Sequence, residues 1–115
     1  MVNNIPEQGD VIWLNLNPKK GHEQQGKRPY LCLSNKIISD YAGIAIFAPI
    51  STTKRSYPVY YDINDLGYTV KGQILLDQIV TVDYNARPFQ YEETLSKEDM
   101  KLILKQAKMV FDENQ

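Results

Sequence analysis

Two polar segments in the first half of the chain carry side chains suited to phosphate chemistry. Residues 21–29 read Gly-His-Glu-Gln-Gln-Gly-Lys-Arg-Pro and separate two hydrophobic runs. Residues 51–55 read Ser-Thr-Thr-Lys-Arg and follow a third hydrophobic run. Most hairpin loops need only about two to five residues, and longer polar loops often present functional groups from a rigid scaffold. We therefore expect these two segments to contain the functional site.

Arg28 is the side chain on which such a site would depend. Its planar guanidinium offers several N–H donors in a fork that suits phosphate oxygens. The hydroxyls of Ser51, Thr52 and Thr53 could donate to a second oxygen if both loops lie at the same end of the fold. Donors of this kind stabilise a phosphoryl transition state electrostatically, and removing one costs about 3–4 kcal/mol of barrier elsewhere. The pattern predicts chemistry on a phosphate without a metal.

The sequence does not single out one residue as the proton acceptor for this chemistry. Arg28 has an ordinary pKa of about 12.5 or more, so it suits stabilisation or proton donation better than base catalysis. Glu23 could either accept a proton or hold Arg28 in an ion pair. His22 is the only histidine of the chain and would titrate near neutral pH. We interpret His22 as a solvated loop residue.

Alternating hydrophobic residues predict the short strands that would hold these loops. The expected strands are residues 10–17, 29–34, 44–48, 58–63, 73–83 and 89–93. Both faces of the first strand are apolar, which predicts cover on both sides. Pro29 is expected to start the second strand and Pro49 to end the third, because proline lacks an N–H. A break is expected near residues 77–78, and a helical turn is possible within residues 35–43.

The last segment has helical periodicity. Ser96 and Asp99 have the spacing of a capping box. Apolar residues then recur at helical spacing and predict a stripe facing the core: Met100, Ile103, Leu104, Ala107, Val110 and Phe111. Short strands followed by one helix predict a mainly β, α+β fold in which a helix closes a small, bent sheet or barrel.

Composition limits the remaining possibilities. The 115 residues, of which 43% are hydrophobic and 23% charged, predict a single domain spanning residues 1–115. No apolar run approaches the roughly 20 residues that cross a membrane, and the N-terminal residues do not resemble a signal peptide. We expect a cytoplasmic protein. Cys32 lies in an apolar run and is interpreted as a buried structural thiol. With one cysteine and one histidine, no metal and no cofactor are expected.

Charge is distributed unevenly along the chain. The net charge of −1 argues against a generally basic nucleic-acid binder. Residues 1–57 nevertheless carry +3 and residues 58–115 carry −4. Four of the seven cations of residues 1–57 fall in the two polar segments, which is compatible with a local anion site. From charge alone, we favour the explanation that lysines are common in solvated loops.

Five motifs in order resemble those of the MazF/PemK/Kid toxin endoribonucleases. They are Gly-Asp-Val-Ile-Trp at 9–13, Gly-His-Glu-Gln at 21–24, Gly-Lys-Arg-Pro at 26–29, Pro-Ile-Ser-Thr at 49–52 and Leu-Asp-Gln-Ile at 76–79. Each motif alone is weak, but their order and spacing are specific, and together they cover nearly the whole chain. The resemblance implies an SH3-like small barrel with a C-terminal helix, a homodimer and the toxin of a toxin–antitoxin system.

The resemblance also implies a reaction. Family members cut single-stranded RNA, mainly mRNA, at short sequences without a metal. The 2′-hydroxyl attacks the adjacent phosphate and leaves a 2′,3′-cyclic phosphate and a 5′-hydroxyl. The family's catalytic arginine corresponds to Arg28, its acidic loop residue to Glu23, and its catalytic threonine to Ser51. Serine keeps the hydroxyl but lacks the methyl that restricts χ1, so Thr52 is the alternative source of the hydroxyl.

Further residues near the loops are candidates for contacting RNA. They are Gln24, Lys27, Tyr30, Thr53, Lys54, Arg55, Tyr57 and Gln78. Tyrosines offer stacking surfaces for bases, although tyrosine is also common in strands. Trp13 is interpreted as a core residue, and Asp10 as a residue that fixes a turn.

Partners follow from the same resemblance. We expect a cognate antitoxin with a disordered acidic segment that folds on binding and covers the RNA groove. The alternative is a non-catalytic binding module of the same fold, either a gyrase poison or a degenerate toxin that only binds antitoxin. By resemblance, gyrase poisoning depends on an apolar C-terminal tripeptide. The Asp-Glu-Asn-Gln end of this chain argues against it.

Overall fold

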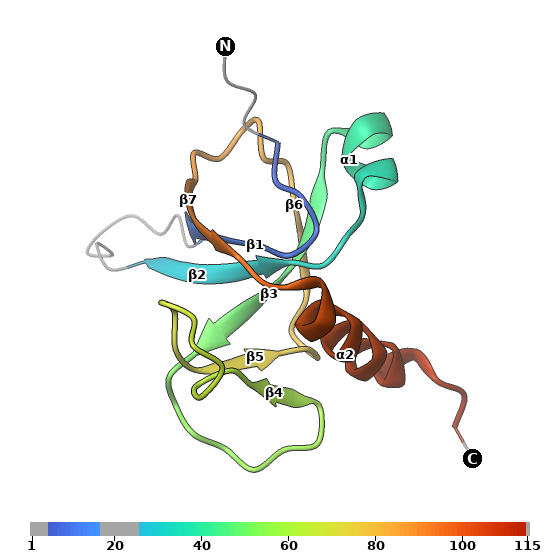
Figure 1. The fold of residues 1–115 in the computed structure, drawn as a ribbon. Coiled ribbons are helices and arrows are strands. Elements are labelled where there is room, and N and C mark those ends of the chain that lie inside the picture. The colour runs from blue at the N-terminus through green and yellow to red at the C-terminus, as the bar shows by residue number, and fades with distance from the viewer. Residues whose placement is uncertain (1–4, 17–25, 115) are drawn as a thin grey trace.

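The computed structural model describes residues 5–16 and 26–114 (Figure 1). Its elements are β1 (Asp10–Asn15), β2 (Lys27–Cys32), α1 (Lys36–Ala42), β3 (Ala45–Ser51), β4 (Tyr60–Asp62), β5 (Gln73–Leu75), β6 (Val80–Val82), β7 (Gln90–Thr94), α2 (Lys97–Lys108) and a 3₁₀ turn, Met109–Phe111. Antiparallel strands predominate and a helix follows them near the C-terminus. The predicted mainly β, α+β fold is confirmed. No helix among the described residues is long and apolar enough to span a bilayer.

The strands form one bent antiparallel sheet in the order β4-β5-β3-β2-β1-β7, with β6 also paired to β3. β3 therefore has three neighbours. Its first residues pair with β6, its middle residues pair with β2, and its last two, Ile50 and Ser51, pair with β5. In Figure 1, β1, β2 and β7 lie above β4 and β5, and β3 runs between the two groups. The bend brings the start of β2 and the end of β3 to the edge of the site described below.

Alternation along β1 explains why the sheet has a core on each face. Val11 belongs to one buried cluster, whereas Ile12 and Leu14 belong to a second. α2 covers the first cluster through Met100 and Ile103. The prediction that the first strand is covered on both sides is confirmed.

Two proline predictions were wrong. β2 begins at Lys27, so Pro29 lies inside the strand opposite Trp13, and β3 continues through Pro49. Pro49 lies where β3 changes partner, since pairing with β6 ends at Phe47 and pairing with β5 begins after Pro49. The missing N–H of Pro49 therefore interrupts neither of those ladders. Continuation of β3 places Ser51 on the strand rather than in a loop.

The predicted break in the fifth strand is confirmed. β5 and β6 are separated by a turn in which the Gln78 N–H donates to the Leu75 carbonyl at 3.0 Å. The expected helical turn is α1, which begins after Asn35 and ends at Gly43 in the left-handed region. Asp10 fixes a turn as expected, since its carboxylate accepts from the Glu7 N–H at 2.8 Å.

The capping box of α2 forms in a modified way. The Ser96 hydroxyl accepts from the Asp99 N–H at 3.0 Å, as predicted. The Asp99 carboxylate does not return to Ser96 but accepts from the Tyr68 hydroxyl at 2.5 Å. The Tyr68 oxygen in turn accepts from the Ser96 N–H at 2.9 Å. Tyr68 thus closes the box and ties the start of α2 to the segment before β5.

The predicted apolar stripe is only partly correct. Met100 and Ile103 are buried, and Leu104 and Ala107 pack against the same cluster. Val110 and Phe111 are exposed, with 73% of the Phe111 surface accessible. The reason is that α2 ends at Lys108, and the following 3₁₀ turn breaks the helical periodicity. An apolar surface is left uncovered at the end of the chain.

Cys32 is fully buried, and burial raises the pKa of its thiol to about 11. The unfolded thiol ionises near pH 8.5, so the folded state holds a proton that the unfolded state has lost between these values. We predict that this group lowers the free energy of unfolding by up to about 1.4 kcal/mol per pH unit in that window. Urea denaturation from pH 8 to pH 10 measures the slope. Cys32→Ala should show a shallower decline, and parallel curves for the two proteins would contradict the prediction.

Gly72 lies against the backbone of Ser51 with φ of 135°. A Cβ at this position would overlap the Ser51 carbonyl oxygen, which cannot move without shifting β3. Gly67 is a matched control because its φ is also positive, at 91°, but nothing lies within 4 Å of its added Cβ. We predict that Gly67→Ala costs about 1 kcal/mol of stability and Gly72→Ala at least about 3 kcal/mol, measured by urea denaturation. Equal losses would show that the contact with Ser51 is unimportant.

Candidate active site

The candidate site opens where β2 and β3 separate. Their pairing ends at Tyr30 opposite Pro49. Arg28 lies two residues before Tyr30 in β2, and Ser51 lies two residues after Pro49 in β3. Beyond this point Ser51 pairs with Gln73 of β5, while Arg28 stays paired with β1. The divergence leaves a cleft of about 480 Å³. Arg28 and Ser51 therefore lie on opposite walls of one opening.

The cleft brings together the groups that the sequence predicted would converge. Arg28, Ser51, Thr52 and Thr53 all line it, although most of β2, all of α1 and most of β3 separate Arg28 from Ser51 in the sequence. Lys71 adds a second cation from the segment before β5. A guanidinium and several hydroxyls that line one cleft supply donors for the oxygens of one phosphate. The arrangement suits an anionic ligand held between β2 and β3.

Ser51 is better ordered for this task than Thr52. Its side chain is half-buried, and its Oγ accepts from the Thr53 N–H at 3.1 Å. This bond uses a lone pair and leaves the hydroxyl proton available for donation. Thr52 is exposed. The geometry supports Ser51 over Thr52 as the source of the hydroxyl.

Gln73 holds the loop that follows Ser51, and sequence reasoning missed it. Only 8% of Gln73 is exposed. Its Oε1 accepts from the Arg55 N–H and its Nε2 donates to the Arg55 carbonyl, each at 3.0 Å. The available signal was an amide in the otherwise apolar run of residues 73–76, because a buried amide requires partners.

Trp13 and Glu92 form another wall of the cleft. The indole Nε1 of Trp13 donates to Glu92 Oε1 at 3.0 Å. Trp13 packs partly against the core, as predicted, but it also faces the cleft. Glu92 is the only carboxylate among the described residues that line this cleft. No sequence signal pointed to Glu92, because its partner lies 79 residues away.

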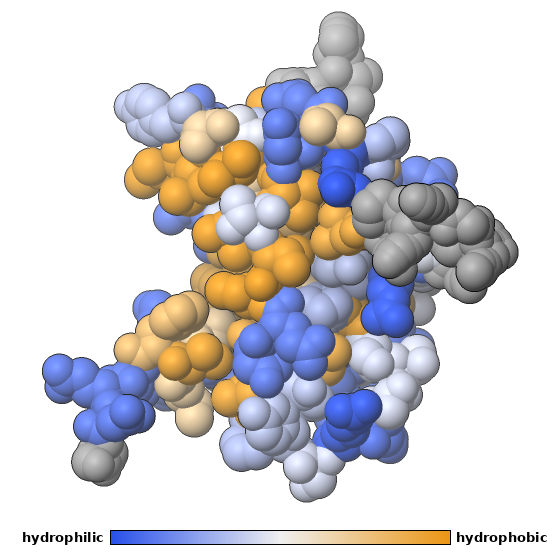
Figure 2. Space-filling view, turned by 180° about the vertical axis from the view of Figure 1, so that it is seen from behind, coloured by the Kyte–Doolittle hydropathy of each residue, from blue (hydrophilic) through white to orange (hydrophobic). Residues whose placement is uncertain are grey.

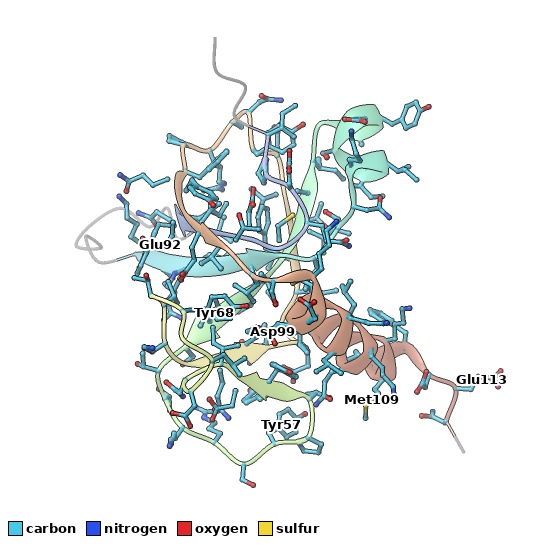
Figure 3. All side chains as sticks on the ribbon, viewed as in Figure 1. Tyr57, Tyr68, Glu92, Asp99, Met109 and Glu113 are labelled. Atoms are coloured by element: carbon cyan, nitrogen blue, oxygen red, sulfur yellow. The ribbon has the colours of Figure 1, made fainter. Side chains whose placement is uncertain are left out.

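Tyr57 and Gln78 come together elsewhere. The rings of Tyr57 and Tyr60 meet edge to face with centroids 4.7 Å apart, and Gln78 Nε2 donates to the Tyr60 hydroxyl at 3.2 Å. The negative charge of Asp77 raises the pKa of Tyr57. Figure 3 shows Tyr57 beside β4, well apart from Glu92. These residues form an exposed aromatic surface separate from the Arg28 cleft.

The remaining predicted contacts have different environments. Tyr30 is only 8% exposed, and burial raises its pKa despite the opposing charge of Arg28. A base-stacking role for Tyr30 is therefore disfavoured, because its ring packs in the core. Lys54 and Arg55 are exposed on the loop after the cleft. Lys27 lines a neighbouring cleft on the other side of Trp13.

Two predicted site residues, Glu23 and Gln24, lie outside the described residues, as does His22. Within residues 5–16 and 26–114, no group of three histidine, cysteine or acidic side chains could hold a metal ion.

Known proteins resemble this chain in sequence and in fold. Residues 7–111 match the family described as PemK-like, MazF-like toxin of type II toxin–antitoxin system. The endoribonuclease toxin MazF of Escherichia coli K12 is 31% identical over 99 residues, which are 86% of this chain and 87% of the relative. Endoribonuclease EndoA of Bacillus subtilis is 36% identical over 83 residues, covering 69% of this chain and 72% of EndoA.

Solved structures agree on the fold. MazF from Deinococcus radiodurans superposes with a TM-score of 0.78 at 24% identity, over 95% of this chain and 98% of that one. A MazE–MazF complex from the same organism gives a TM-score of 0.77 at 19% identity, over 95% and 97% of the two chains. The match to the family over nearly the whole chain, together with these relatives, shows that this protein belongs to the PemK/MazF family of toxins of type II toxin–antitoxin systems.

Proposed function

We propose that this protein is a toxin that cleaves single-stranded RNA, mainly mRNA, at short sequences without a metal. The observation that carries the proposal is the shared cleft that Arg28 and Ser51 both line. The E. coli and B. subtilis relatives are named endoribonucleases, which supports the reaction class. Ser51 in place of the family's threonine keeps the hydroxyl that the chemistry requires.

In the proposed reaction, the 2′-hydroxyl oxygen attacks the adjacent phosphorus and the bond to the 5′ oxygen breaks. Arg28 binds the non-bridging oxygens, and the Ser51 hydroxyl donates to the same phosphoryl group as negative charge builds on it. Glu23 is our candidate to accept the 2′ proton, and the leaving 5′ oxygen takes up a proton from the solvent. The products are a 2′,3′-cyclic phosphate and a 5′-hydroxyl.

We assign the other polar residues to substrate binding. Thr53 lies in the Arg28 cleft, and Lys54 and Arg55 follow it on an exposed loop that can track a phosphate backbone. Tyr57 and Gln78 offer a separate exposed surface for bases. We also assign Gln24, from the segment between β1 and β2, to substrate binding.

A cognate antitoxin is the second proposed partner. Structures of related folds include MazE–MazF complexes and an endoribonuclease with its cognate antitoxin from a mycobacterial species. A cationic cleft that accepts RNA also suits an acidic peptide. We propose that a disordered acidic segment of the antitoxin folds over the Arg28 cleft and competes with RNA.

We also propose a homodimer. Figure 2 shows hydrophobic residues gathered in a hollow between α1 and the end of α2. An apolar groove there is lined by Leu33, Ile46, Ile79, Leu104, Ala107 and Phe111. Exposed apolar surface of this kind marks an interaction site in soluble proteins. Burial of Phe111 in a second copy would explain why this side chain is 73% exposed in the single chain.

The catalytic assignment predicts the outcome of single substitutions. Arg28→Ala and Ser51→Ala should each lower the cleavage rate by about 100- to 1,000-fold, because each removes one donor to the transition state. Thr52→Ala is the matched control and should stay within a few-fold of wild type. Cleavage of a long single-stranded RNA in EDTA, with product ends mapped, measures both rate and chemistry.

Intact RNA at high wild-type concentration would reject the proposed function. An unchanged rate in Arg28→Ala would reject the role of the cleft. Retained cleavage in Ser51→Ala with loss in Thr52→Ala would move the catalytic hydroxyl to Thr52.

The dimer assignment predicts the effect of a charge in the apolar groove. Phe111→Asp should convert a dimer to a monomer, because a carboxylate would have to be buried at the interface. Light scattering after size-exclusion chromatography measures the mass. Leu66→Asp is the control, since Leu66 is 42% exposed in the turn after β4 and does not line the groove. A dimer that survives Phe111→Asp would place the interface elsewhere.

A further inference from the structure

A second cleft lies on the far side of Trp13 from Arg28. It has a volume of about 470 Å³, close to that of the Arg28 cleft. Trp13 lines both clefts and is therefore their common wall. Lys27 and Arg28 are consecutive in β2, and one lines each cleft. The two clefts are thus neighbours, and an extended ligand that crosses Trp13 would enter both.

The cations of the second cleft are held by uncharged partners. Lys27 Nζ donates to Gln90 Oε1 at 3.1 Å, and an Arg87 guanidinium nitrogen donates to the Asn15 carbonyl at 3.2 Å. Neither bond neutralises a positive charge. None of the described residues that line this cleft is acidic. Among the described residues, nothing compensates the two positive charges of this cleft, and both side chains retain further donors.

Besides the polar residues Asn15 and Gln90, the lining has flat, apolar side chains. Pro88 and Phe89 come from the turn before β7, and the Trp13 ring comes from β1. Aromatic faces stack on unpaired bases with little dependence on sequence. Cations for a phosphate beside rings for a base are the groups that recognise a nucleotide of single-stranded RNA.

We propose that this second cleft is a nucleotide subsite next to the reacting phosphate. It binds one flanking nucleotide of single-stranded RNA, the phosphate by Lys27 and Arg87 and the base against Phe89 and Trp13. The role of this flanking nucleotide rests on the proposed endoribonuclease function, whereas the binding itself does not. RNA passes over Trp13, which Glu92 holds in place, and reaches Arg28 on the other side.

Binding without cleavage tests the subsite. The probe is a fluorescein-labelled single-stranded RNA of random sequence with 2′-O-methyl riboses, which lack the attacking hydroxyl. The double variant Lys27→Gln, Arg87→Gln should raise Kd by about tenfold or more in anisotropy titrations. The slope of log K against log salt should become shallower by about 0.7, the contribution of the one phosphate that Lys27 and Arg87 no longer neutralise. An unchanged Kd and salt slope would overturn the inference.

A matched variant separates this effect from loss of net charge. Lys97→Gln with Lys101→Gln removes two exposed cations from α2 and should leave Kd within about twofold of wild type. If both double variants weaken binding equally, the cleft has no special role and the inference fails. Thermal melting by circular dichroism confirms that the variants are folded. A Lys27→Gln single variant is informative even if Arg87→Gln lowers stability, because Lys27 is exposed.

Cleavage assays on unmodified RNA separate the two proposals. RNA binding that depends on Lys27 and Arg87, with no cleavage by wild type, would reject the proposed function and retain the subsite. If wild type cleaves RNA and the double variant does so with the same rate and KM, the function would be retained and the subsite rejected. The expected result is a raised KM in the double variant with kcat changed much less, because the reacting groups lie in the other cleft.

Discussion

The separation of β2 from β3 is the feature on which the site depends. If their ladder continued in register past Tyr30 and Pro49, Arg28 and Ser51 would become neighbours within a sheet, and no ligand could enter between them. β3 instead pairs its last residues with β5. One strand thus belongs to two parts of a bent sheet, and the space between these parts becomes the cleft.

This geometry is held by contacts that do not themselves touch the centre of the cleft. Gly72 lets β5 approach the Ser51 carbonyl closely, and Gln73 fixes the following loop through Arg55. On the opposite side, Glu92 of β7 accepts from the Trp13 indole. The two candidate catalytic side chains, Arg28 and Ser51, are therefore positioned by different strands. The cleft is a product of the whole sheet rather than of one loop.

The strands and the C-terminal helix could be predicted because hydrophobic periodicity is a local property. The positions of the prolines within their strands were predicted wrongly. The cost of a missing N–H depends on which neighbouring strand faces that residue, as at Pro49. Val110 and Phe111 were assigned to the core because periodicity does not show where a helix ends. Arg28 and Ser51 were recognised from motifs, whereas Glu92 and Gln73 act through partners that are distant in the sequence.

The net charge of the chain conceals the charge that a ligand would meet. Glu92 keeps its negative charge in the Arg28 cleft, but its carboxylate is bonded to the Trp13 indole, and no ion pair with Arg28 is found among the described residues. Lys27 is likewise held by a neutral amide. A cation engaged by a neutral partner is ordered without losing its field, whereas an ion pair would weaken the attraction for a polyanion. A protein with a net charge of −1 can therefore present a positive path for single-stranded RNA beside its candidate catalytic groups.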